Sequence, residues 1–277
     1  MSQVDKRRMC PNCRAFITTD DKVCPYCEVQ LGPKAIERRN PAGALGGLIP
    51  HARFTTVMIL LINTGLYAAT LLYSSRANGG SIGLDPDLRT LFDFGAKSRS
   101  AILGGEWWRL ITAGFLHGGL LHILMNSWVL FDLGAQVEET FGTSRYLVFY
   151  FVSTVTGFWA STYWSGAISI GASAGIFGLI GAMIAHGVRE RTSYGAAVRS
   201  MYVRWAFYGL LMGFLFPFTD NAAHVGGLAG GFAVAYIAGT PGFSESVERV
   251  WRIASGIAMG MTVAAFSQMF YRLMGTK

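Results

Sequence analysis

Long apolar stretches alternate with short polar ones along most of the chain. A membrane-spanning helix needs about 20 mostly apolar residues. Stretches of roughly this length comprise residues 54–73, 119–137, 146–164, 170–188, 201–218, 222–240 and 253–271. The fifth is short and contains Arg204, and the seventh contains Ser255, Ser267 and Gln268. This pattern predicts an all-α polytopic membrane protein with seven transmembrane helices.

The composition agrees with a membrane protein, because 52% of the 277 residues are hydrophobic, 14% are charged and the mean hydropathy is +0.38. An ordinary soluble domain is less apolar and more charged. Residues 1–40 are polar, so we expect no signal peptide. The sequence therefore predicts an integral protein of the inner or plasma membrane.

Lysine and arginine residues set the expected orientation, because cytoplasmic loops carry an excess of them. With a cytoplasmic N-terminus, 16 of the 23 basic residues lie on the inner side and 7 on the outer side, five of these in the first outer loop. We therefore predict a cytoplasmic N-terminus and an external C-terminus. The net charge of +7 follows from this topology. Basic and aromatic residues do not interleave as in a nucleic-acid surface, so the lipid bilayer is the expected partner and nucleic acid is not.

All four cysteines lie in one N-terminal segment, CPNCRAFITTDDKVCPYCE, as two C-x-x-C pairs separated by ten residues. Each pair turns both thiolates toward one ion, and two pairs complete the closed tetrahedral site that structural zinc prefers. The predicted zinc ligands are Cys10, Cys13, Cys24 and Cys27. Two disulfides are the alternative. The segment resembles a zinc ribbon, with Arg14 and Glu28 at positions where such knuckles usually have glycine.

Four polar residues inside the predicted spans are candidates for function, because an unpaired polar side chain within the bilayer is unfavourable. His122 and Asn126 lie in the second span, Ser173 in the fourth and His224 in the sixth. Each stands near the beginning of an even-numbered span, so all four are expected at a similar depth below the outer surface. His122 and Asn126 are four residues apart and share one helix face.

These residue types suit nucleophilic catalysis. A serine hydroxyl becomes reactive when an imidazole takes its proton, and the resulting oxyanion needs hydrogen-bond donors. Ser173 and His224 can form such a pair, with His122, Asn126 and the Ser173 backbone N–H as donors. Asp132 and Asp220 are poorly placed to add a carboxylate, so we predict a dyad. The alternative for Ser173 is a hydroxyl bonded to the carbonyl four residues earlier.

Small residues near these positions favour close contact between the fourth and sixth spans. Gly171 and Gly175 flank Ser173, and residues 223, 227, 231 and 235 are alanine or glycine at every fourth position around His224. Packing alone is the alternative explanation for these glycines.

Several separated motifs resemble those of the rhomboid intramembrane serine proteases, in the same order and over about residues 53–240. They are GGEWWRLITAGFLHGGLLHILMNSW, the spacing of Gly134, Glu138 and Gly142, GASAGIFG, and DNAAHVGGLAGG. The resemblance implies Ser173 as the nucleophile and His224 as the general base. It implies His122 and Asn126 as oxyanion-hole donors. The implied substrates are membrane proteins, cleaved where a transmembrane helix unwinds near the outer face.

The resemblance also implies roles around the site. Trp108, Arg109 and His117 are expected to hold the outer loop, Phe177 to pack on the catalytic histidine, and residues 216–223 to form a flexible lid. Ala174 departs from the glycine that commonly follows the serine. The implied organisation is a zinc ribbon (1–32), a linker (33–52), a six-helix rhomboid core (53–240), and an inner loop with a seventh helix (241–277).

Two other functions stay open. A catalytically silent rhomboid-like protein would bind or escort membrane clients, but such proteins typically lack the serine or the histidine. A transporter or channel would use the polar residues as a path, which leaves the GEWWR loop unexplained. A cytosolic partner of the ribbon also stays open.

Overall fold

The described part of the chain forms two units in the computed structural model. Residues 7–10, 12–18, 21–31, 54–77, 79–80, 83–216, 219–242 and 244–275 are described. The two compact units are Met1–His51 and Ala52–Lys277. The predicted linker, 33–52, lies outside the described residues.

The N-terminal unit is a small ribbon built around its cysteines. Strand β1 (Arg7–Met9) pairs antiparallel with β2 (Phe16–Thr18). Cys10 and Cys24 are buried together with Ile17 and Leu31. This core is too small to stabilise the unit alone, since domains below about 40 residues usually need a metal or disulfides.

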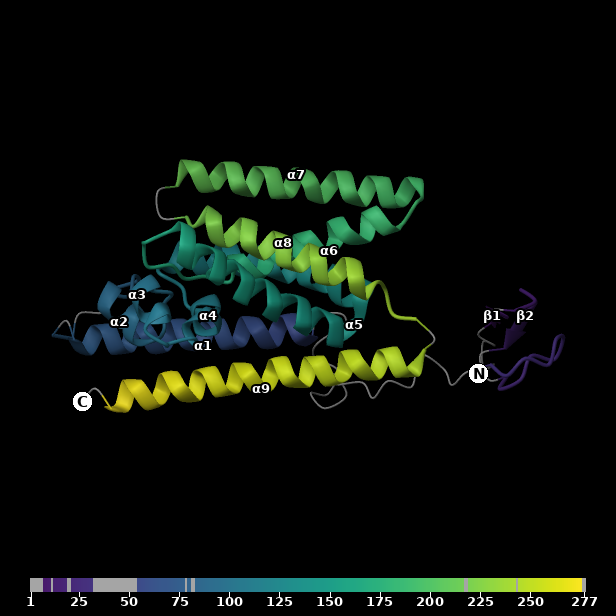
Figure 1. Cartoon of the computed structure of the whole chain (residues 1–277), viewed down its shortest axis with the longest axis horizontal. Helices are drawn as coiled ribbons and strands as arrows, with labels where there is room; N and C mark the ends of the chain where they lie inside the picture. Colours follow the sequence, from purple (N-terminus) through teal and green to yellow (C-terminus); the bar gives the residue numbers. More distant parts are fainter. Residues whose placement is uncertain are drawn as a thin grey trace, which may run out of the picture. The chain divides into compact units, whose positions relative to one another are not determined.

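The second unit is all-α, as the hydrophobic pattern predicts (Figure 1). Its long helices are α1 (Phe54–Ala77), α5 (Leu120–Trp164), α6 (Ser173–Arg189), α7 (Ser193–Leu215), α8 (Asn221–Ala238) and α9 (Glu245–Gly275). Short elements fill the loop between α1 and α5, which the sequence predicts to be the first outer loop: α2 (Leu88–Asp93), α3 (Arg99–Leu103), α4 (Arg109–Thr112) and the 3-10 turn η3 (Ala113–Phe115). Helix α8 packs against α6 and α5, and α7 packs against α6.

Helix α5 contains both the second and the third predicted spans. The sequence predicts an inner loop between them, but helical structure continues on both sides of Gly142, which has φ +75° and ψ 161°. This left-handed conformation separates two helical halves, and glycine adopts it without a steric penalty. The buried Glu138 carboxylate beside the break accepts hydrogen bonds from the backbone N–H and hydroxyl of Thr55 and from the Thr143 hydroxyl at 2.8 Å. It thereby ties the beginning of α1 to α5.

The helices differ in how well they suit a bilayer. Among the described residues, the helices long and apolar enough to cross a membrane are α1, α5 and α9, and α6 is a shorter apolar helix. In α7 the side chains of Arg199 and Arg204 lower the hydropathy, and in α8 those of Asn221 and His224 do so. The seventh predicted span is a continuous helix of 31 residues, longer than the sequence indicates.

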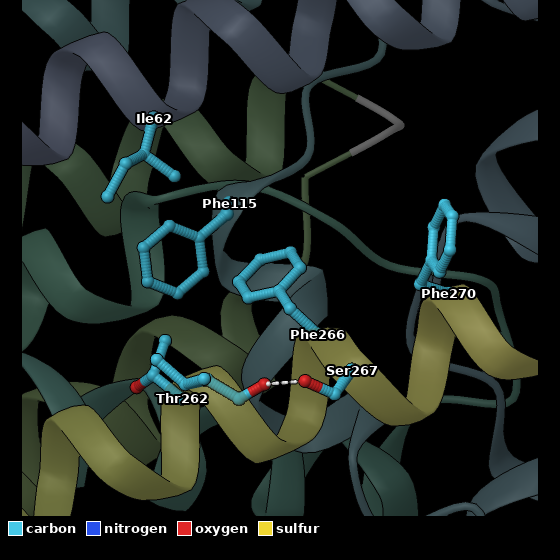
Figure 2. Close-up of a pocket in the computed structure, with 7 residues that line it drawn as sticks. Ile62, Phe115, Thr262, Phe266, Ser267 and Phe270 are labelled. Carbon is cyan, nitrogen blue, oxygen red and sulfur yellow. Dashed lines mark hydrogen bonds between the residues drawn. The ribbon is translucent and has the colours of Figure 1, made fainter.

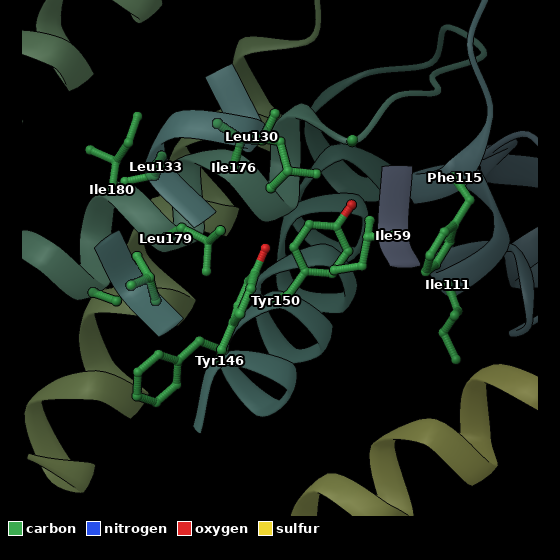
Figure 3. Packing of buried hydrophobic residues seen from close by; sticks show 14 of the residues in the cluster. Ile59, Ile111, Phe115, Leu130, Leu133, Tyr146, Tyr150, Ile176, Leu179 and Ile180 are labelled. Atoms are coloured by element: carbon green, nitrogen blue, oxygen red, sulfur yellow. The ribbon is translucent and has the colours of Figure 1, made fainter. Parts of the chain in front are cut away.

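The hydrophobic core is built mainly from α1, α5, α6 and the short elements before α5, with further buried residues from α7, α8 and α9 (Figure 3). Figure 3 shows Ile59 of α1, Tyr150 of α5 and Leu179 of α6 contributing to it. In a bilayer the lipid tails are as apolar as this core, so close packing rather than apolar burial holds the helices together. The close packing of this core therefore fixes the positions at which α5, α6 and α8 begin.

Helix α9 packs beside the core helices and borders an apolar pocket (Figure 2). The pocket holds about 500 Å³ and is lined by residues of α1, η3 and α9, among them Ile62 and Phe270. At its edge Phe266 meets Phe115 edge-to-face, with ring centroids 5.4 Å apart. None of the candidate catalytic residues lines this pocket. The residues that line the pocket bring α9, the seventh predicted span, into contact with η3 of the predicted outer loop.

The first turn of α9 is held by a buried ion pair. Arg145 is 2% exposed, and its Nη1 and Nη2 donate to Oε2 and Oε1 of Glu248 at 2.7 and 2.9 Å. The guanidinium also lies 5.3 Å from the centroid of the Trp251 ring. The sequence pattern places Arg145 among the solvated charges of an inner loop. The structure instead pairs it with a carboxylate 103 residues away.

We expect Glu248→Gln to lower the free energy of unfolding by about 3–5 kcal/mol, because it leaves the buried Arg145 guanidinium without its counter-charge. Unfolding in detergent micelles, followed by circular dichroism, measures this. Glu245→Gln is the matched control, because Glu245 is exposed in the same turn of α9. Equal stability of Glu248→Gln and wild type would show that the ion pair contributes nothing.

Candidate active site

Three of the four candidate residues come from helix beginnings. Ser173 is the first residue of α6, His122 lies in the first turn of α5, and His224 lies in the first turn of α8. Figure 1 shows α8 beginning at the end of the helical unit where α9 finishes. The prediction that these side chains share one level therefore agrees with the helix boundaries.

Close contact of α6 and α8 brings serine and histidine together. A Cβ atom at Gly227 would collide with the carbonyl of Ala174, and one at Gly231 would collide with the carbonyl of Gly178. These positions accept only glycine because the two backbones touch. The predicted approach of the fourth and sixth spans is confirmed, but Gly175 faces the ring of Tyr150 on α5 instead of α8.

Ser173 and His224 are in hydrogen-bond contact, with Oγ and Nε2 3.0 Å apart. The imidazole is 6% exposed and stacks on Phe177, with ring centroids 4.1 Å apart and planes inclined by 10°. Phe177 lies one helical turn after Ser173, so α6 supplies both the hydroxyl and the surface that orients its partner. This is the spacing at which an imidazole can take a hydroxyl proton.

A carboxylate does not complete the pair within the described residues. Nδ1 of His224 has no hydrogen-bond partner there. The nearby Asp220 carboxylate instead accepts the Ala223 N–H at 3.1 Å and the Ser161 hydroxyl. Asp220 thus caps α8 and fixes its beginning. Ser173 and His224 are therefore in contact without a carboxylate among the described residues, and their action as a catalytic dyad stays a prediction.

His122 presents one ring nitrogen to the same place. Its Nδ1 accepts the Gly118 N–H at 3.4 Å, so in the neutral ring the proton is on Nε2. A Cβ atom added at Gly171 would be 2.8 Å from this Nε2 and 3.6 Å from the Ser173 Oγ. Nε2 is therefore a donor directed at the space beside the serine.

Asn126 is less directly engaged. It lies one turn further along α5 and is half-buried. Within the described part of the chain, no hydrogen bond joins its amide to Ser173, His122 or His224. The structure therefore brings three of the four predicted residues into one cluster and leaves Asn126 on the same helix face.

The beginning of α6 adds backbone donors. Its first intrahelical hydrogen bond runs from the Ile176 N–H to the Ala172 carbonyl at 3.0 Å, so the N–H of Ser173 has no acceptor within the helix. The Gly171 N–H is already bonded to the Ala113 carbonyl at 2.9 Å. An anion beside Ser173 would meet the positive end of the helix dipole.

Of the residues expected to hold the outer loop, Arg109 makes the tying hydrogen bonds, and His117 is buried with no hydrogen-bond partner among the described residues. Buried Arg109 donates to the carbonyls of Phe92 and Ala96 at 2.6 and 2.9 Å and pairs with Glu106. His117 is fully buried before α5, with its ring centroid 5.1 Å from that of His122. Burial lowers the pKa of His117 to about 3, which keeps it uncharged beside the candidate site.

The expected lid is described only in part. Its residues 217 and 218 lie outside the described residues, and its last three form the first turn of α8.

The four cysteines can hold a metal ion. Their Sγ atoms all lie within 4.8 Å of one another, with Cys10 to Cys27 at 3.6 Å and Cys13 to Cys24 at 3.7 Å. A disulfide bond is about 2.05 Å long. Tetrahedral zinc with Zn–S distances of about 2.3 Å places its sulfurs about 3.8 Å apart. The spacing fits a tetrathiolate ion and excludes the disulfide alternative in this structure.

Arg14 and Glu28, which stand where such knuckles usually have glycine, adopt the backbone conformation that glycine would take. Arg14 and Glu28 have φ of 59° and 56°, in the left-handed region that favours glycine. The backbone N–H of each donates to the carbonyl oxygen of the first cysteine of its pair, Arg14 to Cys10 at 3.0 Å and Glu28 to Cys24 at 2.9 Å. Both knuckles therefore keep the turn despite the departure in sequence.

Comparison with known proteins addresses the helical unit. Residues 104–241 match the Rhomboid domain family, and this range contains all four candidate residues. The rhomboid protease GluP of Bacillus subtilis is 38% identical over 171 residues, which are 62% of this chain and 33% of that protein. The chain belongs to the rhomboid family.

Two further relatives show the range of the family. Rhomboid-like protease 2 of Toxoplasma gondii is 33% identical over 193 residues, 66% of this chain and 65% of that protein. Inactive RHOMBOID-like protein 8 of Arabidopsis thaliana is 34% identical over 148 residues, 52% of this chain and 42% of that protein. This rhomboid spans about a third to two thirds of the length of these relatives.

Two residues around the candidate site of this rhomboid are not identified as functional by the sequence pattern. Gly171 has φ +127° and packs against His122, and Lys97 is a fully buried lysine of the outer loop. The spacing of small residues predicts only helix packing for Gly171, and the count of basic residues includes Lys97 only as one of the five in the first outer loop. Gly171 is the first residue of the GASAGIFG motif, and this is the signal that could have identified it.

Proposed function

We propose that this rhomboid is an intramembrane serine endopeptidase that cleaves transmembrane proteins near the outer membrane face. The observation that carries the proposal is the buried contact of 3.0 Å between Ser173 Oγ and His224 Nε2. It lies at the beginning of α6, beside a second imidazole donor. The family relationship to proteins named as proteases supports the proposal. The proposal also includes the domain division predicted from the sequence.

In the proposed reaction Ser173 Oγ attacks the carbonyl carbon of the scissile peptide bond while its proton moves to His224 Nε2. The carbonyl oxygen becomes an oxyanion that accepts hydrogen bonds from His122 Nε2, the Ser173 N–H and Asn126. The C–N bond then breaks, and His224 gives the proton to the leaving amine. His224 then takes a proton from a water molecule that attacks the ester carbonyl, and returns it to Ser173 Oγ as the ester C–O bond breaks.

Phe177 holds the imidazole plane for both proton transfers. Because Nδ1 has no carboxylate partner among the described residues, the imidazolium is stabilised less than in a triad. We expect a slow enzyme whose rate depends on preorganised geometry. Substrate helices that unwind near the outer face would supply an extended peptide to this site.

The wild-type protein tests the proposal. We expect a fluorophosphonate probe to label Ser173, located by mass spectrometry, and the protein in proteoliposomes to cleave a reporter with one transmembrane helix. A folded protein that neither reacts nor cleaves would contradict the proposal and favour a client-binding role, in keeping with the name of the inactive relative.

We place the N-terminus in the cytoplasm, with the ribbon holding a structural zinc ion. The distribution of basic residues supports the orientation, and the sulfur spacing supports the metal. Four protein ligands leave no open position, so the ion would stabilise the ribbon and take no part in proteolysis. Such ions contribute about 10–16 kcal/mol of binding free energy in comparable peptides. Cytosolic partners of the ribbon stay open.

We expect purified full-length protein to contain about one zinc per chain by elemental analysis, since four thiolates bind one ion. Cys24→Ser should lose the metal, because Cys24 is buried at the centre of the ribbon. Thr18→Ser, a conservative change in the same unit, should keep it. A metal-free wild-type protein with an ordered ribbon would contradict the assignment.

A further inference from the structure

Lys97 is buried in the outer loop, where a charged side chain is unfavourable. It lies between α2 and α3 and is 0% exposed. Its Nζ donates to the backbone carbonyls of Ser165 and Ala167 at 2.5 and 3.1 Å. Lysine is almost never fully buried without compensating partners. Burial lowers the pKa of Lys97, and the charge of Asp220 opposes that shift.

The backbone of Lys97 reinforces the same contact. Its N–H donates to the Ser169 carbonyl at 2.9 Å, and the Ser169 N–H donates to the Lys97 carbonyl at 3.2 Å. The pair forms an isolated antiparallel bridge. Side chain and backbone of one residue therefore bind three positions in the segment 165–172, which joins α5 to α6.

This segment ends at the serine. Gly171 is bonded through its N–H to Ala113 and lies against His122 Nε2 and Ser173 Oγ. Lys97 thus fixes the first half of the segment and Ala113 fixes the second. Gly166 and Ala167, by contrast, are exposed, so the outer side of the segment receives little support from packing.

We infer that Lys97 is a positioning residue for the proposed proteolysis. Its ammonium group and backbone hold the connecting segment so that the Ser173 hydroxyl and N–H stay aligned with His224 and His122. A structural role alone would need no charge here, because an apolar side chain of the same length fills the space without desolvating an ammonium group. The inference rests on the proposed serine chemistry.

Lys97→Met keeps the length of the side chain and removes its donors. We expect kcat to fall about 10²-fold with KM unchanged, because a displacement of about 1 Å in a reacting group can have that effect. The rate of fluorophosphonate labelling of Ser173 should fall in parallel. Lys97→Arg, which keeps a charged donor, should recover part of kcat. Arg99→Met is the matched control, since Arg99 is exposed two residues away, and it should behave as wild type.

Cleavage of the reporter in proteoliposomes over a range of substrate concentrations separates kcat from KM, with melting curves beside it. A folded Lys97→Met protein with wild-type kcat, or with only a raised KM, overturns the inference. Should Lys97→Met not fold, Ser169→Pro removes one hydrogen bond of the bridge. Its kcat should fall about two- to tenfold, and an unchanged kcat overturns the inference. Failure of the proposed function is distinct, because the wild type itself would then be neither labelled nor active.

Discussion

Ser173→Ala and His224→Ala are each expected to reduce cleavage of a transmembrane reporter by at least about 10⁴-fold, because neither nucleophile nor base can form the acyl-enzyme without the other. The two losses should be similar and should not add in the double variant. Single-turnover cleavage measures the rate. Fluorophosphonate labelling should disappear in Ser173→Ala and become very slow in His224→Ala.

Two substitutions control for the loss of a buried polar group. Ser153→Ala removes a buried hydroxyl that has no hydrogen-bond partner among the described residues. His186→Gln changes the buried histidine in the last turn of α6, which contacts Phe141 edge-to-face. Both should cleave at nearly the wild-type rate. A folded His224→Ala protein that cleaves as fast as wild type would show that the dyad assignment is wrong.

The position of the candidate site follows from the sequence because it depends on the direction of the helices. Even-numbered spans run in the same direction through the membrane, so polar residues near their beginnings lie at a similar depth in it. His122, Ser173 and His224 show this in the structure. The hydrophobic pattern likewise identifies the long helices, since about 20 apolar residues have few alternatives to a membrane helix.

Contacts between distant elements follow less well from the pattern. A count of basic residues treats Arg145 and Lys97 as solvated loop charges, yet each is buried by partners more than 60 residues away. The spacing of small residues predicts correctly that the fourth and sixth spans approach, but not which glycines make the contact: Gly175 faces Tyr150 of α5. The hydrophobic pattern predicts a loop between the second and third spans, and the structure reduces that loop to a break at Gly142, because one left-handed residue is enough to separate two helical halves.

The geometry of His122 and Asn126 predicts unequal contributions to the oxyanion hole. His122 directs Nε2 at the space beside Ser173, whereas Asn126 lies one turn further along α5. We expect His122→Ala to slow cleavage by about 10²–10³-fold, as loss of one oxyanion donor typically does. Asn126→Ala should have a smaller effect. The Ser173 N–H remains in both variants, so neither should abolish activity.

Single-turnover cleavage at saturating substrate isolates this step, since an oxyanion donor acts in the transition state and lowers kcat rather than raising KM. Melting curves must accompany it, because His122 also contacts His117 and its removal can loosen the outer loop. Ser127→Ala, a neighbouring half-buried position on α5, is the control and should change neither rate nor stability. If folded His122→Ala protein cleaves as fast as this control, His122 is not an oxyanion donor, and the Ser173 N–H at the beginning of α6 is left as the principal one.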